Sequence, residues 1–182
     1  MKKIFIFSLL MLFSSAFSQV IIGDEIGTAS NKKSVLLEFP RGQNKGIILP
    51  YVKELPRGLL LSEGTVLLDA TDPTRAKVKY YNGFGNWVDL SNGNEADISD
   101  AMEIQTGSMD ERLCGKVIIG ATTSSVDGVL ILESSSKAMV LPTVLNTNDV
   151  VNPAPGMMVF VDKPGAKRLA VYNGAVWTYW KP

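Results

Sequence analysis

Lys-Gly-Ile-Ile-Leu-Pro at residues 45–50, followed by Tyr-Asn-Gly at 81–83 and then Trp87, is the stretch that decides the fold, because the chain repeats it. The second occurrence begins with Lys-Ala-Met-Val-Leu-Pro at 137–142 and ends with Tyr-Asn-Gly at 172–174 and then Trp177. The offset between matching residues shrinks slowly, since 142 − 50 = 92, 174 − 83 = 91 and 177 − 87 = 90. Drift of this kind is what small loop insertions leave in a duplicated unit. The sequence therefore predicts two copies of one module, at 19–90 and 117–182.

Both modules are predicted to be all-β. Their apolar runs are short, rich in β-branched residues and bounded by turn residues, a pattern typical of strands. Asn-Gly pairs accept the positive φ angles that tight hairpins demand. We expect two small β-sandwich or β-meander units of five or six short strands each. The repeated positions form a structural signature: Leu49, Pro50, Tyr81, Asn82, Gly83, Trp87, Leu141, Pro142, Tyr172, Asn173, Gly174 and Trp177.

The first 18 residues have the pattern of a secretory signal peptide. Lys2 and Lys3 precede an apolar run over 4–13, and small residues follow at 14–18. Cleavage is expected before Gln19. The apolar run is well short of the roughly 20 residues that a spanning helix needs. We therefore predict export through the general secretory pathway to the periplasm, the outer surface or the medium, with no transmembrane anchor in the mature chain.

An acidic segment, residues 91–116, separates the two modules. It carries Glu95, Asp97, Asp100, Glu103, Asp110 and Glu111. Such a cluster could hold calcium through its oxygen atoms, but it does not match the spacing of an EF-hand loop. The favoured interpretation is a solvated linker with one helical turn at most.

Composition argues against several classes of function. Lys plus Arg and Asp plus Glu both number 18, so no basic surplus draws the chain to nucleic acid. The chain has no histidine and one cysteine, Cys114, which removes the commonest general base and zinc ligand. Carboxylate pairs such as Asp69 with Asp72 lie on predicted loops, where spacing alone shows no catalytic geometry. We predict a protein that is not an enzyme, with no catalytic residues, no bound metal and no cofactor.

Aromatic side chains are the one suggestive constellation. Trp87 and Trp177 are interpreted as core residues that close the hairpins. In a strand Trp177 and Tyr179 share one face and Thr178 and Trp180 the other, so one aromatic face is expected at the surface. The candidate contacts for a partner or a glycan are Tyr80, Phe84, Tyr179 and Trp180.

The repeated motifs resemble a repeat found in exported tail-fibre-like and adhesin-like proteins of Bacteroidetes-type bacteria. The resemblance rests on Lys-Gly-x-x-Leu-Pro and Tyr-Asn-Gly-x-x-(x)-Trp and spans most of residues 19–182, although Ala138 replaces the glycine in the second copy. It implies a structural or adhesion-type surface protein that assembles with itself or with another surface protein. The alternative is a carbohydrate-binding module that uses the hairpin aromatics.

Overall fold

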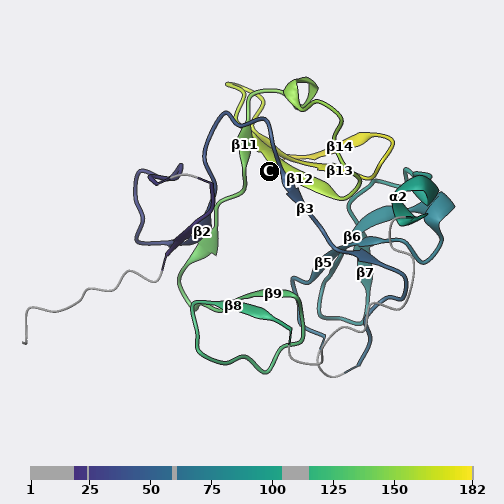
Figure 1. Cartoon of the computed structure of the whole chain (residues 1–182), viewed down its shortest axis with the longest axis horizontal. Coiled ribbons are helices and arrows are strands. Elements are labelled where there is room, and N and C mark those ends of the chain that lie inside the picture. Colours follow the sequence, from purple (N-terminus) through teal and green to yellow (C-terminus); the bar gives the residue numbers. More distant parts are fainter. Residues whose placement is uncertain (1–18, 24, 59–60, 104–114, 182) are drawn as a thin grey trace, which may run out of the picture.

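The computed structural model describes residues 19–23, 25–58, 61–103 and 115–181 of the 182-residue chain. The predicted signal peptide, Cys114, Asp110 and Glu111 lie outside these residues. The described residues are almost entirely β, as Figure 1 shows, and the all-β prediction is confirmed. None of the helices within the described ranges has the length and apolar character needed to cross a membrane.

The strands are short, and each is named here by its bounds. The strands before residue 91 are β1 (Val20–Ile21), β2 (Val35–Glu38), β3 (Ile47–Ile48), β4 (Tyr51–Val52), β5 (Val66–Asp69), β6 (Lys77–Tyr81) and β7 (Trp87–Asp89). The later strands are β8 (Val117–Ile119), β9 (Leu130–Leu132), β10 (Ala138–Met139), β11 (Thr143–Val144), β12 (Met157–Val161), β13 (Arg168–Tyr172) and β14 (Trp177–Trp180). The helical elements are the 3-10 turns η1 (Pro73–Arg75) and η2 (Thr147–Asp149) and the single α-helical turn α2 (Ser99–Glu103).

Two sheets share one connectivity. In the first, β4 runs parallel to β5, and β5, β6 and β7 follow as antiparallel neighbours. In the second, β11 runs parallel to β12, and β12, β13 and β14 follow in the same antiparallel order. Tyr51 lies opposite Leu68 in the first sheet and Thr143 opposite Phe160 in the second, so both pairs are offset by 92 residues. The recurring sequence thus coincides with recurring strand topology.

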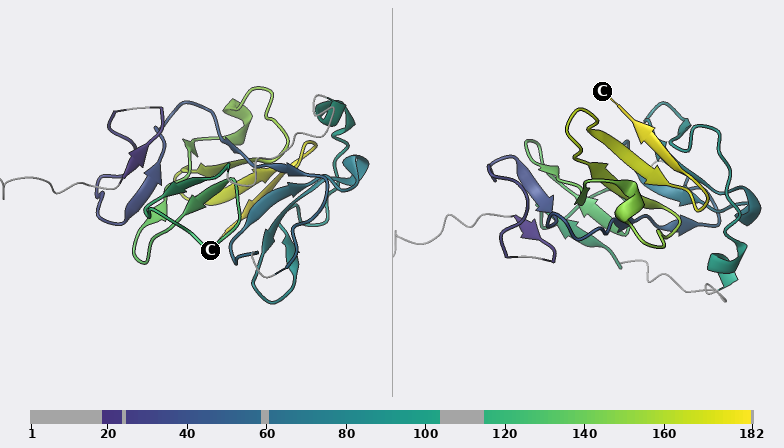
Figure 2. Two further views of the ribbon diagram at one scale, coloured as in Figure 1. Left: turned by 60° about the horizontal axis from the view of Figure 1, so that its bottom comes forward. Right: turned by 90° about the horizontal axis from the view of Figure 1, so that it is seen from above.

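Two smaller sheets also begin alike. β1 pairs parallel with β2, and β8 pairs parallel with β9. They differ on the far edge, because β2 carries β10 as a third strand and β9 carries none within the described residues. The two views in Figure 2 show the N-terminal strands, in purple and blue, lying beside the green strand β10.

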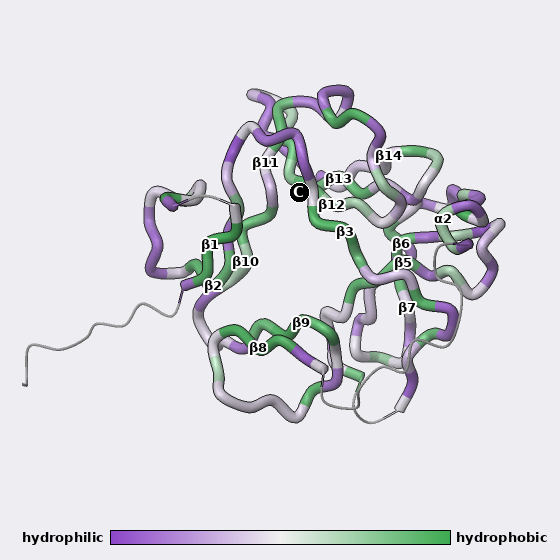
Figure 3. The backbone as a smooth tube through the Cα atoms, in the orientation of Figure 1, coloured by the Kyte–Doolittle hydropathy of each residue, from purple (hydrophilic) through white to green (hydrophobic). Residues whose placement is uncertain are grey.

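The two halves of the chain exchange strands. β3, from the first half, pairs antiparallel with β12 in the second. In return β10, from the second half, pairs parallel with β2 in the first. The sheets of each half are therefore completed by a strand from the other half. Figure 3 shows that the sheets of the two halves alternate around the molecule and that their strands carry hydrophobic residues, in green.

The larger core is shared as well. Leu68 and Val78 of the first main sheet pack in one cluster with Met158 and Val171 of the second. Ala96, Ile98 and Met102 also belong to this cluster, so part of the predicted linker contributes side chains to the core. A second cluster around Val144, Val159 and Val161 covers the other face of β12. A module near 70 residues buries only about 60% of its unfolded surface alone, and the shared cluster supplies the missing burial.

Candidate functional site

The repeated signature builds the two hairpins. Asn82 Oδ1 accepts the amide of Phe84 at 3.0 Å, and Asn173 Oδ1 accepts that of Ala175 at 2.9 Å, so each asparagine fixes its turn. The glycines that follow have φ angles of 82° and 118°, a region that residues with a Cβ rarely adopt. The loops span residues 82–86 and 173–176, and only the glycine of each Asn-Gly pair has a positive φ, so the turns are longer than the tight two-residue hairpin that Asn-Gly favours.

Each hairpin also presents one tyrosine to one tryptophan. The ring centroids of Tyr81 and Trp87 lie 5.5 Å apart at a tilt of 51°, and those of Tyr172 and Trp177 lie 5.2 Å apart at 43°. Tilted contacts of this kind add to the stability gained by burial. Trp177 also packs against the second core cluster, which agrees with its interpretation as a core residue.

The Leu-Pro pairs begin the main sheets. Pro50 accepts the amide of Leu68 and Pro142 that of Phe160, both at 2.9 Å. Leu49 and Leu141 pack against the shared core cluster. Because proline has no amide hydrogen but keeps its carbonyl, it can start a parallel pair only as an acceptor. The role of the signature is therefore structural.

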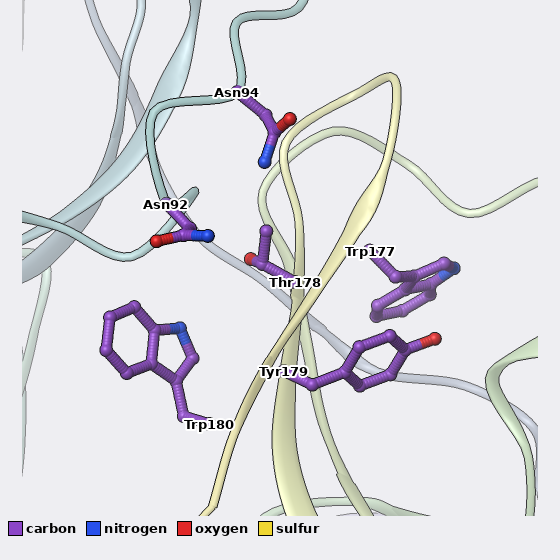
Figure 4. A pocket seen from close by; sticks show the side chains of 6 residues that line it. All are labelled: Asn92, Asn94, Trp177, Thr178, Tyr179 and Trp180. Atoms are coloured by element: carbon purple, nitrogen blue, oxygen red, sulfur yellow. The ribbon is translucent and has the colours of Figure 1, made fainter.

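The four candidate contact residues occupy two separate hairpins. Tyr80 is half-buried in β6 and packs against the shared core, while Phe84 sits on the β6–β7 turn with 87% of its surface exposed. Tyr179 and Trp180 lie at the end of β14 and are 43% and 38% exposed. Figure 4 shows Trp177 and Tyr179 on one side of β14 and Trp180 on the other, as the period of a strand requires.

A pocket forms where β14 meets the segment after β7. Its lining residues are Asn92, Asn94, Trp177, Thr178, Tyr179 and Trp180 (Figure 4). Trp180 Nε1 donates to the Leu90 carbonyl at 2.9 Å, and Thr178 Oγ1 donates to the same oxygen at 2.7 Å. Two of the four candidate contacts, Tyr179 and Trp180, thus share a pocket with two amide side chains.

Tyr179 is fixed on its own side of the strand. Its hydroxyl shares a hydrogen bond of 2.8 Å with Thr147 Oγ1. The guanidinium carbon of Arg168 lies 4.4 Å from the ring centroid, within the range of a cation–π contact. The ring is therefore preorganised, although part of its surface stays exposed.

Sequence reasoning missed Asn92 and Asn94. They follow the first main sheet in a polar run, Ser-Asn-Gly-Asn at 91–94, which was interpreted only as a flexible connector. Asn92 has a φ of 52°, and the Asn94 carbonyl accepts Asn173 Nδ2 at 2.9 Å. The available signal was the turn chemistry of the run, but nothing local indicates that it meets β14.

The carboxylates serve turns and ion pairs. Asp69 Oδ2 lies 2.6 Å from Lys79 Nζ, and Asp72 Oδ1 caps η1 by accepting the Thr74 amide at 3.0 Å. Side-chain hydrogen bonds from Arg75 and Lys77 lower the pKa of Glu95 to about 2. Among the described residues, no three acidic or cysteine side chains gather closely enough to hold a metal ion.

Comparison with known proteins gives one match. Residues 118–182 match the model of a family described as "Phage tail like trimerisation region". No curated protein and no solved structure matches the chain. The matched range contains β9 to β14 and most of β8. It supports a tail-fibre-like β region in this part of the chain and a structural, self-associating role.

Proposed function

We propose that this chain is an exported, non-catalytic subunit of a tail-fibre-like surface assembly in which three copies associate. The observation that carries the proposal is the match of residues 118–182 to a trimerisation region. The repeat resemblance supports the exported and adhesion-type part, since proteins with such motifs act through assembly at the cell surface. The partner is a second and third copy of the same chain, alone or with another surface protein.

The exposed apolar side chains support assembly. Val117, Val129 and Leu130 are all exposed, and all three belong to or flank the small β8–β9 sheet. Large contiguous apolar patches on a protein surface often mark contact sites for other proteins. The matched region includes Val129 and Leu130. Burial of this patch between copies is the physical mechanism that we propose.

The test is the mass of the mature chain, residues 19–182, by light scattering coupled to gel filtration. Three times the mass of one chain is expected across a tenfold dilution series. A protein that elutes as a monomer even at high concentration would disprove the assembly. Localisation needs a separate measurement, for which the full chain should appear in the envelope or the medium with Gln19 at its N-terminus.

The pocket beside β14 favours glycan binding as the second candidate. An exposed indole next to two amides combines a surface that can stack on a sugar ring with groups that hydrogen-bond hydroxyls. A glycan array should then show binding that Trp180→Ala abolishes and Phe84→Ala leaves unchanged. An array without any hit would leave assembly as the only function supported.

A further inference from the structure

Among the residues that the structure describes, one strand edge is open although its counterpart is covered. β9 corresponds to β2, because Ile131-Leu132-Glu133 repeats Leu36-Leu37-Glu38 and both strands pair parallel with the strand before them. β2 is covered on its other edge by β10, and Val35 there is 3% exposed. Its counterpart in β9, Leu130, is 49% exposed, and within the described residues no strand lies beside it.

The backbone of β9 is ready to pair on that edge. The Val117 amide donates to Val129, and the Glu133 amide donates to Ile119, both at 2.9 Å. Successive amides of a strand face opposite edges. The polar groups of Leu130 and Leu132 therefore face away from β8, toward the open side.

In the described part of the chain, β3 has an unpaired edge as well. The Leu49 amide donates to Gly156 at 3.1 Å on the β12 side, so the amides of Gly46 and Ile48 face away from β12. Ile48 is 54% exposed. The residues 92 positions later, Ala138 and Val140, donate to Ser34 and Leu37 of the β2 segment, both at 2.8 Å. β10 and β2 are the counterparts of β3 and β9, and they pair with each other in this chain. β3 and β9 do not pair with each other within the described residues.

We infer that β3 of one copy adds in parallel to the free edge of β9 of a second copy, in the manner of β10 on β2. This inference rests on the proposed self-assembly and names its surface. In the register of the internal pair, Gly46 lies opposite Leu130 and Ile47 opposite Leu132. Each copy offers one β3 edge and one β9 edge, so the contact is head-to-tail, and three copies joined in this way, as in the proposed assembly, form a closed ring. Ile48 and Leu130 become buried when it forms.

The edge of β5 at Val66 is also unpaired within the described residues, but we do not infer that a strand of another copy binds there. Val66 of β5 corresponds to Met158 of β12, which holds β3, and no strand covers Val66 within the described residues. By analogy with β3 on β12, the strand expected to pair with this edge of β5 is β10, the counterpart of β3. β10 carries Ala138 at the position of Gly46. A Cβ at Gly46 would lie 2.5 Å from Met157 Cγ and 2.9 Å from the Met158 carbonyl. An alanine there would collide with the β5 backbone, so β10 fits β2 and not β5.

The first test is a cross-link between differently tagged copies. Both chains carry Cys114→Ser, one adds Ile47→Cys and the other Leu132→Cys, and they are co-expressed and purified through both tags. Residues directly opposite in neighbouring strands lie within the Cα range of a disulfide. We expect an oxidised band that contains both tags. The control pair, Ile47→Cys with Val176→Cys, should give at least tenfold less.

The second test breaks the edge with charge. Leu130→Lys should shift the mass from trimer to monomer, whereas Val151→Lys, at another exposed apolar position, should leave the trimer intact. A trimer that survives Leu130→Lys and gives no β3–β9 cross-link would overturn the inference and leave the proposed assembly standing. A wild-type monomer would remove both. If Leu130→Lys does not fold, the presence or absence of the cross-link decides.

Discussion

Gly46, directly before β3, lies so close to Met157 of β12 that a Cβ built on Gly46 would come within 2.5 Å of Met157 Cγ and 2.9 Å of the Met158 carbonyl. The backbone oxygen cannot move aside cheaply, so the glycine is what allows the strand exchange between the halves. Its counterpart Ala138 belongs to β10, which pairs with β2 instead. The departure from the repeat motif therefore coincides with a difference in strand partner.

Gly46→Ala should destabilise the fold by about 1–3 kcal/mol, the usual range for overpacking. The cause is separation of β3 from β12. Urea unfolding followed by tryptophan fluorescence measures the change. Ala138→Gly is the matched control and should cost no more than about 1 kcal/mol, through backbone entropy alone. Equal losses in the two variants would contradict the steric role of Gly46.

Asn173→Ala should cost about 2–3 kcal/mol, because the buried amide makes three hydrogen bonds at about 1 kcal/mol each. Asn173 Oδ1 accepts hydrogen bonds from the amides of Ala175 and Val176, and Nδ2 donates to the Asn94 carbonyl in the segment that follows the first module. Asn82→Ala is the comparison, since Asn82 Oδ1 accepts the Phe84 amide alone. Its loss should be about 1 kcal/mol. Urea midpoints that fall equally would argue against a stabilising role of the bond between Asn173 and Asn94.

Trp177→Ala should cost about 3 kcal/mol, the scale for deleting a large aromatic from a core. Trp177 packs on the second core cluster and contacts the Tyr172 ring. Trp180→Ala should cost only about 1 kcal/mol, because this more exposed ring loses mainly its hydrogen bond to Leu90. Thermal unfolding of both variants by circular dichroism gives the order. A larger loss of stability in Trp180→Ala than in Trp177→Ala would contradict the assignment of Trp177 as the core residue.

Stability should fall in acid through Glu38. Burial opposes its ionisation, but hydrogen bonds from Lys32 and from the amides of Ala29 and Thr28 outweigh this and lower its pKa. A lowered pKa in the folded state means that the contribution is complete above the unfolded value of about 4.3 and is lost as the pH falls through the folded value. Glu38→Gln should therefore destabilise by about 2 kcal/mol at pH 7.

The difference between wild type and Glu38→Gln should shrink as the pH is lowered from 7 to 3, when measured by urea unfolding. Glu133→Gln is the control at the counterpart position, where the carboxylate accepts a hydrogen bond from Ser124. It should cost less at pH 7. A Glu38→Gln difference that stays constant with pH would show that the carboxylate charge is not what stabilises this site.

Some local features of the fold were predictable. The short β-branched runs bounded by turn residues predicted strands, and the glycine after each asparagine has the positive φ expected at a turn. The Tyr–Trp ring contacts and the Leu-Pro strand starts were not predicted. The strand exchange was not predictable, because β3 and β12 pair across about a hundred residues and leave no periodic pattern in either segment. The burial of Ile98 and Met102 in the core was not predicted either, because the acidic residues around them indicate a solvated linker.

The candidate site was predictable only in part. Alternation along β14 placed Tyr179 and Trp180 on opposite faces, as Figure 4 shows. The approach of Leu90, Asn92 and Asn94 to that strand depends on how the two main sheets stack. The free edge of β9 became visible only by comparing two strands of one structure.

The most direct test is the mass of residues 19–182 in solution, measured by light scattering over a tenfold range of concentration. Assembly through the matched region predicts three times the mass of one chain, and the Leu130→Lys variant should return the mass to that of one. A single-chain mass for the unaltered protein at every concentration would contradict assembly.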